Sequence, residues 1–274
     1  MPTVNSVRRA GSTDEETDPV TMLTAYDAPT ASVVDDAGVD MILVGDSVGN
    51  AKLGYDTTLP VSVDEIASAT GAVARATADA VVVADMPFLS FGADETESVR
   101  NAGRMLKEED ADAVKLESGP HTVSLTETLT SLGIPVMAHL GLTPQHVNQL
   151  GGYFRQGTDQ DSAERMLDLA RDHEAAGAFA LVLEHVPANV AADITDAIDI
   201  PTIGIGAGPD TDGQVLVISD VIGMSERSPP FSKQFGDVNR EMAAAVDDYV
   251  DAVESGSFPA AEHSHVADDV DDVY

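Results

Sequence analysis

Charged side chains mark the ends of several short apolar runs in this 274-residue chain. Four of these runs are followed by a carboxylate, a fifth is followed by a histidine, and one contains a lysine: Asp46, Asp85, Glu117, Glu184, His139 and Lys115. If the runs are parallel strands of a barrel, their carboxyl ends meet at one face and bring these side chains together. Converging carboxylates repel one another and are costly to desolvate, so a cation stabilises them. Oxygen ligands favour Mg²⁺, and the sequence has neither cysteine nor an HExxH motif for zinc.

The segment DAVKLESG (112–119) places two of these charges within one apolar run. Side chains alternate between the two faces of a strand, so Lys115 and Glu117 share one face while Val114 and Leu116 share the other. The chain has only four lysines, and a lysine retained inside an apolar strand indicates a function. A structural ion pair in the barrel interior is the alternative explanation.

The remaining residues also have purely structural explanations. Asp46 and Asp85 could each cap the helix that follows. Glu184 could be a surface residue in an ion pair, and His139 could be a hydrogen-bonded core residue. The group is stronger evidence than its members, because unrelated residues would not fall so regularly at the ends of strands.

The apolar runs alternate with amphipathic segments along the chain. Most runs have four to eight residues and are rich in Val, Ile and Leu, which is typical of strands covered on both faces: 20–27, 41–46, 80–85, 113–118, 134–140, 179–184, 200–207 and 214–223. Helical patterns lie between them, for example at 62–77, 94–110 and 161–177, and Ser62 with Glu65 resembles a capping box. Eight strands separated by helices favour an α/β fold of the (β/α)8 TIM-barrel type in a single domain.

The predicted domain organisation has three parts. Residues 1–18 read as an acidic, flexible N-terminal segment, and residues 258–274 read as a flexible acidic tail. The catalytic barrel spans residues 19–257 and ends in a helix predicted over 237–256.

Acidic residues dominate the charge of the chain. Asp and Glu number 48 against 14 Lys and Arg, which gives a formal net charge of −34 spread along the sequence. Such a surface is typical of a protein adapted to a salt-rich cytoplasm, where the short Debye length screens the repulsion. An acidic surface for a basic protein partner is the alternative. The charge argues against nucleic-acid binding, and the absence of a signal peptide or a long apolar run predicts a cytoplasmic location without membrane association.

Glycines are concentrated in the segment GIGAGPDTDG (204–213). A dinucleotide-binding fingerprint requires glycine where this chain has Pro209, so a Rossmann site is excluded. After a seventh barrel strand, a glycine-rich turn would let backbone amides approach a ligand. A simple tight turn explains the glycines equally well.

A set of motifs resembles the ketopantoate hydroxymethyltransferase (3-methyl-2-oxobutanoate hydroxymethyltransferase) family. The motifs occur in order from about residue 20 to 264: TAYDAPTA (24–31), VGDSVGN (44–50), GYDTTLPVSVDEI (54–66), ADMPF (84–88), VKLESG (114–119), HLGLTPQ (139–145), GGYFRQG (151–157), VLEHVP (182–187), IPTIGIGAGPDTDGQVLV (200–217) and ESGSFPAAEHS (254–264). The resemblance therefore covers nearly the whole chain.

The resemblance implies a reaction and a set of roles. The family transfers a one-carbon unit from 5,10-methylenetetrahydrofolate, a reduced folate, to the 2-oxo acid 3-methyl-2-oxobutanoate and gives 2-dehydropantoate, for pantothenate and coenzyme A synthesis, through a Mg²⁺-stabilised enolate. Metal binding is implied for Asp46, Asp85 and Glu117, the last of these through water. Substrate binding is implied for Asp46, Ser47, Asp85, Lys115 and His139. Glu184 corresponds to the base that removes the C3 proton, and the family's assembly implies a homo-oligomer, a decamer.

Two other functions are compatible with the same residues. One is a Mg²⁺-dependent lyase or mutase of the phosphonopyruvate and isocitrate-lyase-like barrels, for which we expect a reactive cysteine or a mobile lid motif; the chain has no cysteine. The other is a metal-dependent binder of 2-oxo acids that catalyses no reaction.

Overall fold

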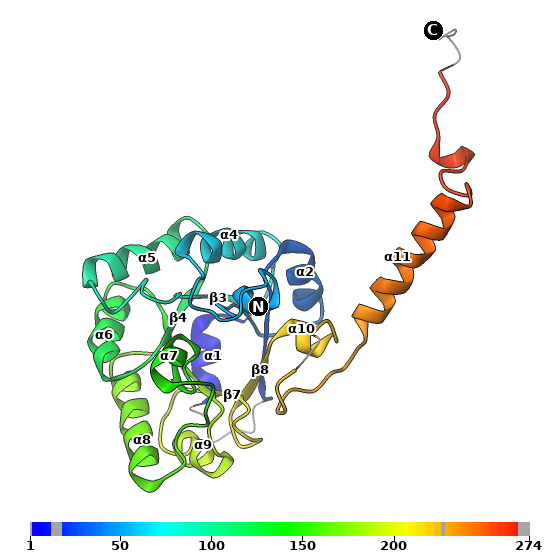
Figure 1. The fold of residues 1–274 in the computed structure, drawn as a ribbon. Helices are drawn as coiled ribbons and strands as arrows, with labels where there is room; N and C mark the ends of the chain where they lie inside the picture. Colours follow the sequence, from blue (N-terminus) through cyan, green and yellow to red (C-terminus); the bar gives the residue numbers. More distant parts are fainter. Residues whose placement is uncertain (1, 12–17, 226–227, 268–274) are drawn as a thin grey trace. The chain divides into compact units, whose positions relative to one another are not determined.

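Eight parallel strands close into a barrel in the computed structural model, which describes residues 2–11, 18–225 and 228–267 (Figure 1). The strands follow one another around the barrel in chain order, and β8 pairs with β1. Their bounds are β1 (Val20–Thr24), β2 (Met41–Val44), β3 (Val81–Asp85), β4 (Ala113–Glu117), β5 (Val136–Gly141), β6 (Ala180–Glu184), β7 (Thr202–Ile205) and β8 (Gly213–Leu216). The TIM-barrel prediction is confirmed.

Helices pack around the outside of the barrel (Figure 1). The main ones are α2 (Ala28–Asp36), α4 (Val63–Ala74), α5 (Glu95–Lys107), α6 (Val123–Ser131), α8 (Gln160–Ala175) and α9 (Ala188–Thr195). The predicted capping box begins α4: Ser62 Oγ accepts from the Glu65 amide at 3.2 Å, and the Glu65 carboxylate accepts from the Ser62 amide at 2.7 Å. These bonds satisfy amides that have no partner inside the helix.

The interior of the barrel changes from apolar to polar along the strands. Near the amino ends it is filled by a cluster that includes Met22, Met41, Val81 and Met137. Inward-facing positions recur every second residue. On β4, for example, buried Ala113 is followed at the next two inward positions by Lys115 and Glu117. The amino end of the barrel interior is therefore an apolar cluster, and the charged residues lie at the carboxyl ends of the strands.

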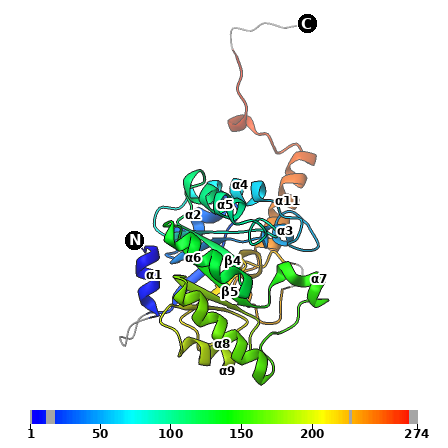
Figure 2. The ribbon, with the colours of Figure 1, turned by 90° about the vertical axis from the view of Figure 1, so that its left-hand side faces the viewer.

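A short helix closes the amino end of the barrel. Residues Val4–Ala10, which we expected to belong to a flexible segment, form α1. Its Val7 is 4% exposed and packs with Val4 and Ala10 against the barrel cluster. Figure 2 shows α1 at the end of the barrel opposite to α3 (Val48–Ala51) and α7 (Val147–Leu150). Of the rest of the expected segment, Met1 and residues 12–17 lie outside the described residues.

One connection departs from the strand–helix alternation. Residues 206–212 join β7 to β8 without a helix, so one part of the outer layer is missing there. After β8 only the four-residue α10 (Ile218–Val221) follows directly.

The C-terminal residues form a unit of their own. Residues 1–218 with 229–232 make up the barrel unit, and residues 219–228 with 233–274 make up a second compact unit. The terminal helix predicted over 237–256 is α11 (Val238–Glu254) in this second unit. The DDVDDVY end (268–274) lies outside the described residues. Within the described chain, no helix is long and apolar enough to cross a membrane.

Candidate active site

A buried ion pair forms the centre of the candidate site. Strand register places Lys115 of β4 beside Asp85 of β3, and Lys115 Nζ lies 2.9 Å from Asp85 Oδ1. Asp85 is 1% exposed and Lys115 is 5% exposed. The lysine therefore pairs with the aspartate of the neighbouring strand, and not with Glu117 two residues along its own strand. The alternative of a Lys115–Glu117 ion pair is wrong in this respect.

Asp46 approaches the same pair from the turn after β2. Its amide donates to Asp85 Oδ2 at 3.0 Å, and its own Oδ2 accepts from Gln145 Nε2 at 3.0 Å. Neither aspartate caps the helix that follows it, since the N-cap of α3, after Asp46, is Ser47 and the N-cap of α5, after Asp85, is Asp94. Both aspartates are buried, and the Asp85 carboxylate contacts the backbone of Asp46, so the two residues meet at this end of the barrel.

Ser47 lies next to Asp46 and points to a different partner. Its Oγ is 2.7 Å from the hydroxyl oxygen of Tyr26, which follows β1. Ser47 is therefore held at the carboxyl end of the barrel, but the hydrogen bond of its side chain goes to Tyr26.

Glu117 is held by the loop that follows β5. Both of its carboxylate oxygens accept from the Gln145 amide, at 3.1 and 3.2 Å, and His146 Nδ1 lies 3.5 Å from one of them. Gln145 thus contacts Glu117 through its backbone and Asp46 through its side chain. It belongs to the HLGLTPQ motif, but its neutral side chain gave no signal of its own in the charge pattern.

His139 connects the ion pair to Glu184. Its Nδ1 is 3.5 Å from Lys115 Nζ, and its Nε2 is 3.2 Å from Glu184 Oε2. An ammonium has only donors to offer, so Nδ1 is the ring nitrogen placed to accept from Lys115, while Nε2 faces the Glu184 carboxylate. The side chain of Glu184 is 19% exposed and is the most accessible of the four carboxylates.

Burial and crowding shift the pKa values of this group. Burial raises the pKa of Asp85 to about 7; Lys115 opposes the rise and the Asp46 carboxylate adds to it. Burial also raises the pKa of Glu117, against the opposing effect of His146. Burial alone would lower the pKa of Lys115, but the Asp85 and Asp46 carboxylates outweigh it and raise that pKa. The site therefore carries more buried negative charge than one ammonium balances.

The donor set suits Mg²⁺ better than a metal that needs a complete protein cage. Among the described residues, no group of three or more His, Asp or Glu side chains could hold a metal ion by itself. Mg²⁺ usually takes one or two carboxylates and completes its shell with water and substrate oxygens. Asp46 and Asp85 meet that requirement, and a divalent cation would offset the surplus negative charge. The oxygens of Glu117 face the Gln145 amide, which favours contact with a metal through water.

Comparison with known proteins shows the family of the chain. The family model described as ketopantoate hydroxymethyltransferase matches residues 5–261. Two proteins named 3-methyl-2-oxobutanoate hydroxymethyltransferase are similar to this chain. The one from Natronomonas pharaonis is 70% identical to it over 97% of this chain and 98% of that protein, and the one from Haloarcula marismortui is 69% identical over the full length of both. A solved phosphonopyruvate hydrolase, in complex with oxalate and Mg²⁺, shares the fold with a TM-score of 0.59 at 13% identity, covering 96% of this chain and 93% of that one. The chain belongs to the ketopantoate hydroxymethyltransferase family.

Proposed function

We propose that the protein transfers the one-carbon unit of 5,10-methylenetetrahydrofolate to 3-methyl-2-oxobutanoate and releases 2-dehydropantoate. The observation that carries this proposal is the continuous series of contacts from Asp85 through Lys115 and His139 to Glu184. It joins a cation suited to the carboxylate of a 2-oxo acid to a carboxylate suited to removing a proton. Family membership supplies the identity of the two substrates.

Lys115 is the residue that we assign to the substrate's negative charge. An oxo acid enters a site that already contains four carboxylates, so a fixed ammonium is needed to offset the added anion. Because Asp85 holds Nζ at 2.9 Å, the ammonium is positioned before the substrate arrives. Ser47, one residue from Asp46, is proposed to donate its hydroxyl to the same substrate.

Glu184 is proposed as the base that takes the C3 proton. It is the most accessible of the site carboxylates, and it lies at the end of β6 where a substrate bound to Lys115 would be adjacent. His139 contacts it at 3.2 Å and fixes its orientation, so His139 is a positioning residue in this proposal. The proton moves from C3 to a Glu184 oxygen, and the resulting carbanion equivalent forms a C–C bond with the methylene carbon of the donor. The bonds from that carbon to the folate nitrogens break, tetrahydrofolate leaves, and one water supplies the hydroxyl group of 2-dehydropantoate.

Asp46 and Asp85 are proposed to hold Mg²⁺, with Glu117 contacting it through water. A bound Mg²⁺ supplies Lewis-acid stabilisation of negative charge on the keto oxygen. Gln145 assists by fixing Asp46 Oδ2 and by donating its amide to Glu117. We further propose a cytoplasmic homo-oligomer, a decamer as in the family.

Product formation tests this proposal. Purified protein in high-salt buffer with Mg²⁺ should convert 3-methyl-2-oxobutanoate and 5,10-methylenetetrahydrofolate to 2-dehydropantoate, detected by mass spectrometry. The same preparation is offered oxaloacetate and phosphonopyruvate as a comparison. Cleavage of those acids, with no 2-dehydropantoate formed, would contradict the transferase and favour a lyase.

A further inference from the structure

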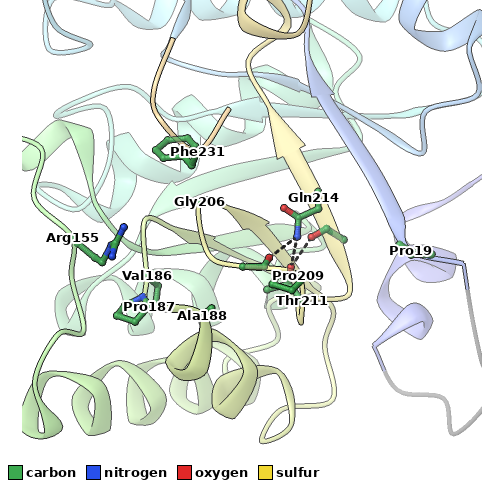
Figure 3. A pocket seen from close by; sticks show the side chains of 12 residues that line it. Pro19, Arg155, Val186, Pro187, Ala188, Gly206, Pro209, Thr211, Gln214 and Phe231 are labelled. Carbon is green, nitrogen blue, oxygen red and sulfur yellow. Dashed lines mark hydrogen bonds between the residues drawn. The ribbon is translucent and has the colours of Figure 1, made fainter. Parts of the chain in front are cut away.

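A cavity of about 720 Å³ lies where the outer layer of the barrel lacks a helix (Figure 3). Its walls include residues 186–188 after β6, the loop from Gly206 to Thr211 after β7, and Phe231. Cavities of this volume take ligands of drug-like size. None of the residues that we assign to the oxo acid or to the metal lines it, so it is formed by a different set of residues.

The cavity begins beside the strand end that carries Glu184. Val186, in its wall, is two residues beyond Glu184, and Gly206 directly follows Ile205, the residue that pairs with Glu184 across β6 and β7. His185, between Glu184 and Val186, has its ring 5.5 Å from the ring of Phe231. The cavity therefore adjoins the ends of the two strands, β6 and β7, that hold the proposed base.

Arg155 gives the cavity a positive charge. It is the one charged residue among the lining residues, although the chain has 48 acidic residues and 14 Lys and Arg. Figure 3 shows its side chain at the cavity margin. Within the described chain, the guanidinium forms no ion pair or hydrogen bond with another residue. An unpaired arginine at an otherwise uncharged wall is suited to a carboxylate or phosphate.

The glycine-rich loop offers backbone donors to the same cavity. Gly206 and Gly208 have φ values of 63° and 91°, and within the described chain their amides donate to no acceptor. The Gly208 carbonyl is already engaged by Gln214 Nε2 at 3.0 Å. Turns with such alternating backbone conformations make concave sites for anions. Close packing also requires these glycines, because a Cβ at position 206 would lie 2.8 Å from the Phe231 ring.

We propose that this cavity binds the one-carbon donor, with its aromatic part against Phe231 and the carboxylates of its glutamate end on Arg155 and on the Gly206 and Gly208 amides. The inference rests on the proposed function. A reduced folate combines a planar aromatic body with an anionic end, and these are the two features that the walls provide. The 2-oxo acid has no aromatic part and is far smaller than the cavity. Placement beside β6 brings the donor next to the carbon that Glu184 deprotonates.

The test compares Arg155→Gln with Arg171→Gln, an exposed arginine on α8 that does not line the cavity. Two donors are used, 5,10-methylenetetrahydrofolate and 5,10-methylenetetrahydropteroate, which lacks the glutamate. Because Arg155→Gln removes a charge-assisted contact, we expect it to raise the KM for the folate about ten- to hundredfold. The KM for the oxo acid and the donor-independent exchange of its C3 hydrogen should stay as in the unsubstituted protein. With the pteroate donor, the two variants should have equal KM values.

Other results would overturn the proposal. A folate KM equal in both variants, or a rise in KM for Arg155→Gln that is as large with the pteroate donor, removes Arg155 from recognition of the glutamate. Equal loss of exchange and transfer would assign a structural role to the arginine. If the unsubstituted protein forms no 2-dehydropantoate, the proposed function fails, and calorimetric titration with tetrahydrofolate then decides on the cavity: binding weakened by Arg155→Gln supports it, and absence of binding refutes it.

Discussion

Replacing Lys115 by methionine tests the electrostatics of the site most severely. Methionine keeps most of the apolar stem but removes the ammonium, so the 1%-exposed Asp85 would be left beside Asp46 without its cation. Removing one partner of a buried ion pair typically costs about 3–5 kcal/mol when the other partner stays charged. Asp85 has an alternative, because its pKa is already about 7 and would rise further in the variant.

The expected loss of stability therefore depends on pH. Below pH 7, Asp85 is largely protonated in both proteins, and Lys115→Met should cost about 1–2 kcal/mol or less. Above pH 7, the unsubstituted protein keeps a charged pair, while the variant must either bury an unpaired carboxylate or take up a proton. A group whose folded pKa is raised loses stability as pH rises, so the cost should grow toward about 3–5 kcal/mol by pH 9.

Urea unfolding without metal at pH 6, 7, 8 and 9, at constant high salt, measures this cost. Lys107→Met is the matched control, because Lys107 is an exposed lysine near the end of α5. The free energy of unfolding of the control should stay within about 0.5 kcal/mol of the original value at every pH. A loss for Lys115→Met that is the same at pH 6 and pH 9, or no larger than that of the control, would refute the reasoning.

Three further predictions concern residues around the barrel. Gln145→Leu should weaken Mg²⁺ binding about tenfold or more by freeing Asp46 Oδ2, and a calorimetric Mg²⁺ titration with unchanged affinity would contradict this. Val7→Ala should lower the free energy of unfolding in urea by about 1.5–3 kcal/mol, because Val7 is buried in the apolar cluster of the barrel. Val33→Ala, at a 69%-exposed position, should change it by almost nothing, and equal effects would show that α1 does not close the barrel. Burial lowers the pKa of His173, so its contribution to stability is present above its unfolded pKa near 6.5 and is lost as pH falls through the folded value. Between pH 7.5 and 5, the free energy of unfolding should therefore fall less with acid for His173→Gln than for the control His265→Gln, and parallel curves would exclude this.

Alternating apolar runs were sufficient to predict the barrel and the meeting of its strand ends. The period of two along β4 predicted that Lys115 and Glu117 face inward, and both are buried there. The partner of Lys115 could not be predicted in the same way. It depends on the register between β3 and β4, which places Asp85 opposite Lys115, and register is a property of two strands that one strand's pattern does not contain.

Other features lacked a local signal. The seven residues of α1 are too few for a stable isolated helix, and Val7 is stabilised only by burial against the barrel. Gln145 carries no charge, and its contacts to Asp46 and Glu117 depend on the fold of the loop after β5. The glycines at 206 and 208 allowed either a turn or a ligand loop from sequence. Their unpartnered amides, beside Arg155 and a cavity, became visible only in three dimensions.

Exchange of the C3 hydrogen of 3-methyl-2-oxobutanoate tests the central claim most directly, because it isolates proton removal from one-carbon transfer. The protein, incubated in deuterium oxide with Mg²⁺ and the oxo acid but without a pterin, should incorporate deuterium at C3, observed by proton NMR. Glu184→Gln should slow the exchange about a hundredfold or more while binding the oxo acid with unchanged affinity. Exchange at the original rate in Glu184→Gln would contradict the assignment of the base. Absence of exchange in the unsubstituted protein would contradict the deprotonation step itself.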